Sequence, residues 1–324
     1  MLRDKPSINN LRNRDKKGGF LSIRSKMFIY FGLMFILVLT MFVSLDLYGI
    51  PFTNFRGLFK QKQSESLRNL NLVADLKKER MARWLEERRD DMRVLAESSI
   101  IRFYVYLLAS VIHENTVNGV KENQLLSELQ KKKDHQALMQ HLRLVKRSYG
   151  VYDKIQIADA LTGTIIASTH NKDMGMDVLQ LDSNSRVFHP GYNEAVDIDK
   201  DPSSGALKLT ISHTINHYVI DDKTLAVLIM QVNPDDFIKP MLHTGGGLGQ
   251  TGEALLVNSE AKILSTPKHP LADGTMAIPL EYQLKDEPAI LASRGEEGII
   301  ATRDYRGKKV LAAYRHIRIT SELE

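Results

Sequence analysis

The sequence GGGLGQTGEALLVN occupies residues 245–258, and Gly247, Gly249 and Gly252 within it match the spacing G-x-G-x-x-G. A nucleotide-binding loop with this spacing follows a strand and opens a helix, whose N-terminal N–H groups hold the phosphates. Here the glycines lead into EALLVN, an apolar segment typical of a strand, and no Gly-Lys-Ser or Gly-Lys-Thr follows. The loop therefore predicts a turn that enters a run of strands.

Short segments typical of strands recur on both sides of this loop, with turn residues between them. Before the loop they cover residues 152–159, 162–169, 205–215 and 223–232. After the loop they cover residues 251–258, 261–267, 298–307 and 308–317. Each set has the order strand, turn, strand, irregular excursion and two further strands, so the sequence predicts one fold used twice. The segment between the sets, residues 233–242, predicts a capped helix with proline near its start.

An uncharged segment of nineteen residues, Met27–Leu45, precedes all of these strands. A helix of this length is about 28 Å long, enough to cross the hydrocarbon core of a bilayer. Residues 1–26 carry eight Lys and Arg against Asp4 and Asp15, a net charge of +6. We expect an uncleaved anchor with the N-terminus in the cytoplasm and the chain after residue 50 outside it. The alternative is a buried helix of a soluble protein.

The remaining composition excludes several classes of function. The whole chain has a net charge of +5, so the residues after the basic tail are close to neutral and offer no face for nucleic acid. The chain has no cysteine, which excludes disulfides, thiolate metal sites and thiol catalysis. His213 and His217 have a spacing that suits a metal on a helix, but on a strand they lie about 13 Å apart. We expect no catalytic residue, no metal and no cofactor.

A long amphipathic helix is predicted over about residues 55–97. Apolar residues recur at spacings of four and three, in part as in a coiled coil, with charged residues on the other faces. The repeating positions are Met81, Leu85, Arg88, Met92 and Leu95. We interpret the helix as a stalk that pairs with a second copy in a homodimer, or as a helix that packs on its own domain in at least its second half. A second helical region covers about residues 100–149.

This arrangement resembles the double Cache family of bacterial extracytoplasmic sensors. The most specific pieces are WLEERRDDMRVLAES (residues 84–98), GLGQTGEALLVN (residues 247–258) and DYRGKKVLAAYRHI (residues 304–317). The resemblance implies an α+β fold with a transmembrane helix, a long stalk helix and two tandem PAS-like modules with antiparallel sheets. Its glycines would form a tight turn into the second module and bind nothing.

The resemblance also implies how the chain divides. The expected segments are a cytoplasmic basic tail (1–26), a transmembrane helix (27–49), a stalk and helical region (50–149), a membrane-distal Cache module (150–242) and a membrane-proximal Cache module (243–324). The family usually continues with a last strand, a second membrane helix and a cytoplasmic output module. The chain ends before these, so we interpret it as a truncated product or a fragment.

The function implied is ligand sensing by a membrane-bound bacterial signal-transduction receptor without catalytic activity in this region. The expected location is the inner (plasma) membrane, with the lipid bilayer as a partner and the sensor region periplasmic or extracellular. A sensor histidine kinase is the favoured parent, and a diguanylate cyclase or a chemoreceptor is the alternative. The alternative of another class is an exported binding protein or hydrolase tethered by its N-terminal helix.

In the family, a small molecule usually lies in the distal module between the sheet and the irregular excursion, here residues 170–204. The expected ligand residues are Arg186, Phe188, His189 and Tyr192 on the excursion and Thr210, Ser212 and His213 on the facing strand. Arginine with aromatic side chains suits a small carboxylate. The amino-acid-binding branch carries Arg-x-Trp-Tyr at a comparable place, and this chain carries Arg-Val-Phe-His, so we expect a simpler organic acid. The alternative is that these residues surround a pocket lined by others.

Overall fold

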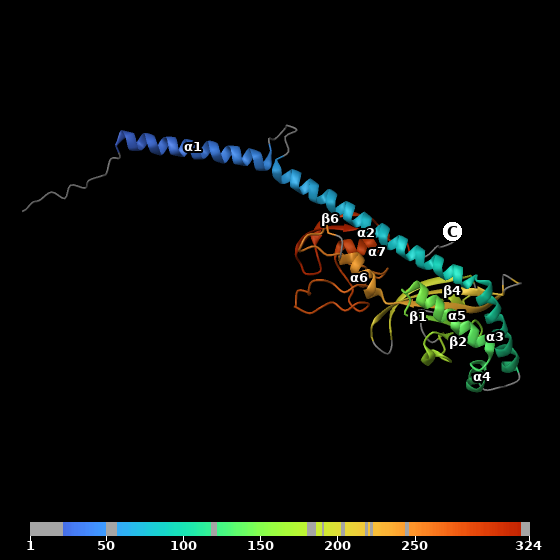
Figure 1. Cartoon of the computed structure of the whole chain (residues 1–324). Coiled ribbons are helices and arrows are strands. Elements are labelled where there is room, and N and C mark those ends of the chain that lie inside the picture. The colour runs from blue at the N-terminus through green and yellow to red at the C-terminus, as the bar shows by residue number, and fades with distance from the viewer. Residues whose placement is uncertain are drawn as a thin grey trace, which may run out of the picture. The chain divides into compact units, whose positions relative to one another are not determined.

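The computed structural model describes residues 22–49, 57–117, 122–179, 186–189, 191–201, 205–217, 220, 223–243 and 246–318. The chain divides into two compact units, residues 1–66 and 67–324. Figure 1 labels the helices and strands used below.

The first unit contains α1, Ile23–Tyr48. This helix of 26 residues has a mean hydropathy of 2.5 and no buried residue, so by length and composition it is a candidate membrane span. It contains the whole of the predicted segment Met27–Leu45. Its last turn ends at Gly49, whose N–H donates to the Leu45 carbonyl at 2.8 Å.

Helix α2, Leu58–Ala96, contains no glycine or proline to interrupt it. From Met81 onward it buries one face, formed by Met81, Leu85, Met92 and Leu95. The same side chains carry the spacing that predicted a coiled-coil seam. They lie in the core of the domain, so the second half of α2 packs on its own domain and these residues are not available to a second copy.

Four more helices precede the glycine loop in the described part of the chain, and two of them contact the sheet described below. They are α3 (Ser99–Val117), α4 (Glu122–Leu129), α5 (Lys133–Tyr149) and the short α6 (Ile238–His243). Helix α3 follows α2 at a bend of 58°. Helix α5 buries one apolar face and ends at Gly150, which has the left-handed conformation (φ 70°) that glycine adopts without strain. Helices α3 and α5 contact strands of the distal sheet (Figure 1).

Residues 150–242, predicted as the distal module and so named below, contain a five-stranded antiparallel sheet in the order β2-β1-β5-β4-β3. Its strands are β1 (Lys154–Asp159), β2 (Ile165–Ser168), β3 (Glu194–Lys200), β4 (Leu207–Asn216) and β5 (Thr224–Val232). Four of them match the predicted strands. The fifth strand, β3, lies inside the stretch predicted to be irregular. Its sequence hides the strand, because it is a half-buried edge strand in which aspartates alternate with Val196 and Ile198.

The segment after β5, predicted as one capped helix over residues 233–242, forms a capped 3₁₀ turn followed by a short helix. Asn233 caps a 3₁₀ turn, η4 (Pro234–Asp236), by accepting a hydrogen bond from the Asp235 N–H at 3.1 Å. Helix α6 follows directly. Phe237 between them stacks on Trp84 of α2 with ring centroids 3.5 Å apart, which fixes this connection against the long helix.

Residues 243–324, predicted as the proximal module and so named below, contain a two-stranded sheet, β6 (Gly298–Arg303) with β7 (Lys309–Tyr314), and helix α7 (Glu287–Ser293). The strands predicted at residues 251–258 and 261–267 are reduced to isolated bridges, of Val257 with Ile263 and of Lys262 with Gln283. Between them, the Leu264 N–H donates to the Leu256 carbonyl at 2.7 Å, and the Leu256 N–H donates to the Ser265 hydroxyl at 3.0 Å. A small core of Ala261, Ile263, Ala277, Leu284 and Ala289 closes this module.

We expect the stability of the distal module to depend on pH through His135 of α5. Its side chain is 5% exposed, and its Nε2 lies 3.1 Å from the Ile166 carbonyl of β2. Burial lowers the pKa of His135 below its ordinary value, with Arg143 acting in the same direction. Below about pH 6.5 the imidazole of His135 therefore takes up a proton in the unfolded chain but not in the folded chain. As the pH falls from there to the folded pKa of His135, the free energy of unfolding decreases by at most about 1.4 kcal/mol per pH unit.

The measurement is urea unfolding at pH 7.5 and pH 5.5, followed by the fluorescence of Trp84, the single tryptophan. The loss of stability on acidification should be smaller in His135→Gln than in the wild type. The exposed His170 serves as the control, and His170→Gln should keep the wild-type loss. Equal losses in the wild type and His135→Gln would exclude His135 as the source.

Candidate functional site

The two faces of the distal sheet differ in chemistry, because successive residues of a strand point to opposite faces. One face packs into the large core with α2, α3 and α5, and β4 contributes Leu209, Ile211 and Ile215 to it. The opposite face carries a much smaller apolar cluster. That cluster consists of Ala158, Ile165, Val178, Val187, Ala195, Val227 and Ile229, with Met174 and Phe188 packed against it.

The face with the small cluster is also lined by buried polar side chains. Cross-strand pairing places Thr210 opposite Gln231, Ser212 opposite Ile229 and Thr214 opposite Val227. Thr210 and Ser212 are 2% and 1% exposed, so water has almost no access to them. A buried polar row on a sheet face is unusual unless something polar meets it.

Two of these hydroxyls are without a hydrogen-bond partner in the described part of the chain. Thr210 Oγ1 and Thr214 Oγ1 are buried and make no hydrogen bond there, and the same holds for Asp199 Oδ2 on the neighbouring β3. Leaving a buried hydroxyl unsatisfied costs about 1–3 kcal/mol. The β4 side of this face is therefore short of partners, which is the condition that a bound polar ligand would relieve.

The β1 side of the same face is satisfied by the protein itself. Asp173 accepts a hydrogen bond from Gln156 Nε2 at 3.0 Å and an ion pair from Lys154 Nζ at 3.0 Å. The Ser168 hydroxyl lies 3.4 Å from the same carboxylate oxygen. This network ties the turn η1 (Asn171–Asp173) to the sheet and needs no ligand.

The excursion places only part of the predicted residues over this face. Phe188 and Val187 lie in the 3₁₀ turn η3 (Arg186–Phe188) and pack against the small apolar cluster. His189 is exposed, and Tyr192 is 56% exposed. The backbone of Arg186 belongs to η3, and its side chain lies outside the described part of the chain.

His213 does not join Thr210 and Ser212. It pairs with Leu228 of β5, which belongs to the large core, so its side chain lies on the opposite face of the sheet. Its Nδ1 lies 2.7 Å from the Thr214 carbonyl. Thr214 of β4 and Gln231 of β5 line the polar face instead. The period of two along β4 is the sequence signal that would have selected Thr214.

A buried carboxylate on the helix face serves the fold. Asp159 Oδ1 accepts hydrogen bonds from the N–H groups of Leu161 and Thr162 at 3.0 and 2.9 Å and so organises the turn between β1 and β2. Its Oδ2 lies 3.3 Å from His113 Nε2 of α3, but the two atoms are not aligned as a hydrogen bond. The described residues include no group of three His, Asp or Glu side chains placed to hold a metal ion.

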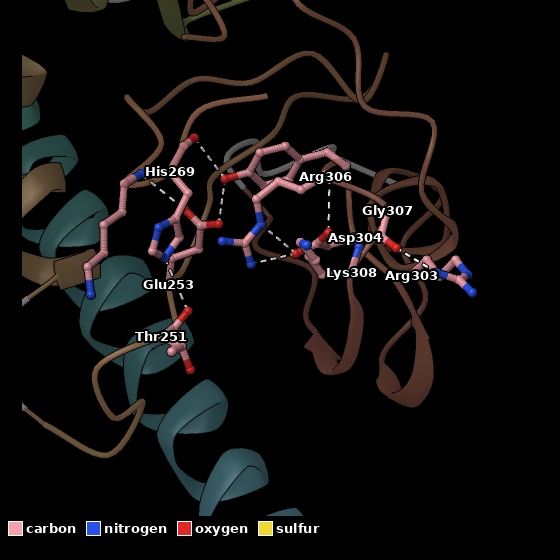
Figure 2. A network of polar contacts seen from close by, with 10 residues as sticks. Thr251, Glu253, His269, Arg303, Asp304, Arg306, Gly307 and Lys308 are labelled. Atoms are coloured by element: carbon pink, nitrogen blue, oxygen red, sulfur yellow. Dashed lines mark hydrogen bonds and ion pairs between the residues drawn. The ribbon is translucent and has the colours of Figure 1, made fainter. Parts of the chain in front are cut away.

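In the proximal module, two of the three sequence pieces that carried the family resemblance, residues 247–258 and 304–317, meet each other. The Tyr305 hydroxyl donates to Glu253 Oε1 at 2.5 Å and lies 3.2 Å from the His269 carbonyl. Lys268 N donates to Glu253 Oε2 at 3.0 Å, and His269 Nε2 lies 3.2 Å from the Thr251 carbonyl. Figure 2 shows this network at the end of the glycine loop.

The neighbouring hairpin turn is held by Asp304. Its carboxylate accepts from Arg306 Nη2 at 2.6 Å and from the N–H groups of Arg306 and Lys308 (Figure 2). Burial acts to raise the pKa of Asp304, but hydrogen bonding to these donors outweighs it and holds this pKa below its ordinary value. Burial, together with Glu253, raises the pKa of Tyr305, so its hydroxyl stays protonated as the donor. These contacts are structural. They hold the end of the glycine loop and the hairpin turn together where the chain enters the proximal module.

Comparison with known proteins identifies similar folds. The family model described as Cache domain matches residues 60–323. No curated protein sequence matches the chain. A domain of a putative sensory box/GGDEF family protein from Vibrio parahaemolyticus has a TM-score of 0.50 at 14% identity, covering 81% of this chain and 93% of that chain.

Two further solved structures resemble the chain at lower scores. The sensory domain of the Campylobacter jejuni chemoreceptor Tlp3, with isoleucine bound, has a TM-score of 0.49 at 11% identity over 82% of this chain and 91% of that chain. The sensor domain of E. coli DcuS has a TM-score of 0.34 at 14% identity over 51% of this chain and 96% of that chain. Likeness at such identities concerns the fold alone.

Proposed function

Since the chain belongs to the Cache domain family, we propose that it is the extracytoplasmic sensor region of a bacterial membrane receptor and binds a small molecule on the polar face of its distal sheet. The observation that carries the proposal is the pair of buried, unsatisfied hydroxyls of Thr210 and Thr214. Ligand pockets combine apolar walls with a few polar groups that fix orientation. Phe188 and the small apolar cluster supply the first, and the polar row of β4 and β5 supplies the second.

The ligand we propose is a small organic acid. Hydroxyl and amide groups such as Thr210, Ser212 and Gln231 can donate to carboxylate oxygens, and Arg186 on the excursion can pair with the charge. His189 and Tyr192 remain in the proposal as residues at the rim, since both are exposed. His213 is not part of this proposal, because it lies on the opposite face of the sheet, which packs against the large core.

A thermal-shift screen of the full chain in detergent against small carboxylates tests this site. A true ligand should raise the unfolding temperature in a saturable manner, and Arg186→Ala should weaken its binding at least tenfold, since a charged pair is worth about 1.5–3 kcal/mol. A ligand that binds Arg186→Ala with unchanged affinity removes Arg186 from the site.

A second variant separates a binding role from a structural one. Thr210→Val keeps the shape of the side chain and removes the unsatisfied hydroxyl, so the ligand-free protein should become more stable, by about 1 kcal/mol, while ligand affinity falls. Thr169→Val is the matched control, because the Thr169 hydroxyl accepts from the Ile155 N–H at 3.0 Å and its loss should destabilise the protein. If Thr210→Val also destabilises the protein, the hydroxyl has a structural role and the proposed site is wrong.

An N-terminal apolar helix followed by a Cache sensor domain fits a membrane-anchored receptor with an extracellular sensor. We propose that α1 crosses the inner membrane once, with the basic residues 1–26 in the cytoplasm and the sensor in the periplasm. A periplasm-specific reporter enzyme fused after Glu324 should be active. A silent reporter there, with an active cytoplasmic one, would reverse the orientation.

The output of the receptor is a separate proposal. The family resemblance favours a histidine kinase, with a diguanylate cyclase or a chemoreceptor as the alternative. A tethered binding protein or hydrolase would carry no second membrane helix. The reading frame downstream of residue 324 distinguishes these, because a second apolar segment followed by a kinase or cyclase motif identifies the output.

A further inference from the structure

A cavity lies in the unit of residues 67–324, at a place that the proposed distal site does not involve. It has a volume of about 360 Å³, is open to solvent, and is lined by residues of α2, α6, the loop of residues 246–252 and residues 266–268. Volumes of about 300–1,000 Å³ are typical of small-molecule sites. Apolar atoms of Leu242, Leu248 and Pro267 form part of its wall.

The charges that line this cavity are mainly positive. Lys77, Lys239, Lys268 and His243 contribute cationic or protonatable groups, and Glu253 is the acidic residue among the lining side chains. Both carboxylate oxygens of Glu253 accept hydrogen bonds from neutral donors, one from the Tyr305 hydroxyl and the other from a backbone N–H. Three lysines against this one carboxylate leave the lining with a net positive charge.

Lys77, one of these lysines, is a residue of α2 and binds the end of α6. Its Nζ donates to the carbonyls of Met241 and Leu242 at 2.8 and 2.7 Å, at the C-terminal end of α6. Burial and, after it, the positive charge of Arg80 lower the pKa of Lys77. An anion nearby would act in the opposite direction and favour the charged ammonium.

The glycine loop leaves room for a ligand on this side. Gly246 and Gly249 line the cavity with φ of 67° each, and a Cβ on either would meet open space. On the other side of the loop, a Cβ at Gly247 would lie 2.4 Å from the Val73 side chain of α2. Glycine at position 247 thus lets the loop lie close against α2, and glycine at positions 246 and 249 leaves that part of the cavity wall without side chains.

We propose that this cavity binds a small soluble anion with carboxylate or phosphate oxygens, as a second ligand site. The lysines supply the charged donors, and the apolar wall accommodates a short carbon chain. One wall of the cavity is α2, so a bound anion would connect the stalk helix to α6 and to the entry of the proximal module. Such a ligand would stabilise these contacts without touching the distal sheet.

Isothermal titration of the full chain in detergent with succinate and with inorganic phosphate tests the proposal. At least one of the two anions should bind saturably, and Lys239→Gln combined with Lys268→Gln should weaken that binding about tenfold or more. Lys239→Gln alone should weaken it in the same direction. Its side chain is exposed, so this variant should fold normally even if the Lys268 contact to the Gln250 carbonyl is needed by the loop.

One control distinguishes binding in this cavity from a general effect of surface charge. Lys309→Gln removes an exposed lysine of β7 outside the cavity and should leave binding unchanged. The proposal is overturned if neither anion binds saturably in the millimolar range, if Lys239→Gln binds as the wild type does, or if Lys309→Gln weakens binding equally.

Discussion

Replacing Met92 with alanine should destabilise the domain by about 2–5 kcal/mol, the range measured for removing a large buried apolar side chain. Met92 is 1% exposed and lies in the large core between α2 and the distal sheet. The loss should appear in urea unfolding followed by circular dichroism. Val94→Ala on the same helix is the control, because Val94 is 64% exposed and should change stability by less than about 0.5 kcal/mol.

The burial of Met92 also bears on pairing between two copies of the chain, which we propose from the amphipathic pattern of residues 55–97. With Met92 inside the domain, the outer side of α2 carries the exposed Leu72 and Leu76. Leu72→Cys and Leu76→Cys should therefore crosslink in membranes, whereas Met92→Cys should not. Equal crosslinking at all three positions would contradict both the burial of Met92 and a defined pairing face.

Replacing Tyr305 with phenylalanine should destabilise the proximal module by about 1.5–3 kcal/mol, because a hydrogen bond to a charged carboxylate is lost. The single hydroxyl proton goes to Glu253 Oε1, the nearer acceptor at 2.5 Å. Without it, the end of the glycine loop loses its link to the hairpin turn. Hydrogen exchange should accelerate at the amides of residues 246–258 and remain unchanged in the distal sheet.

Tyr149→Phe is the matched control for this variant. Tyr149 lies at the end of α5, is 39% exposed and has an edge contact with the ring of Tyr152, which phenylalanine keeps. Its substitution should leave exchange in residues 246–258 as in the wild type. Faster exchange throughout the protein in Tyr305→Phe would indicate general loosening rather than the loss of one local contact.

The family and the α+β fold predicted from the sequence are confirmed, and the strands show where such prediction works. Strands β4 and β5 carry long runs of apolar and β-branched residues, and both ends were predicted to within a few residues. Strand β3 was missed because three of its seven residues are acidic, and only pairing with β4 makes it a strand. Tertiary pairing decides such segments, and local sequence does not record it.

The candidate site was predictable in part. The sequence placed Thr210 and Ser212 correctly on one strand, but it grouped His213 with them although neighbouring strand residues face opposite ways. The partner residues Gln156 and Gln231 come from other strands, so their place depends on sheet order and register. The cavity beside the glycine loop brings together α2 and residues 160 to 190 positions later in the chain, a proximity that no spacing in the sequence indicates.

Helix α2 limits the ways in which the two modules can move relative to each other. Arg315, at the end of β7, donates to Asp75 at 2.5 Å and to Asn71 at 2.6 Å, and Met92 is held in the distal core seventeen residues after Asp75. An unbroken helix keeps these two anchor points about 26 Å apart. Stretching along this axis is therefore excluded while both anchors hold. A bound ligand can then cause only two kinds of movement. The modules can rotate about α2, or α2 can slide along its axis as one rigid body.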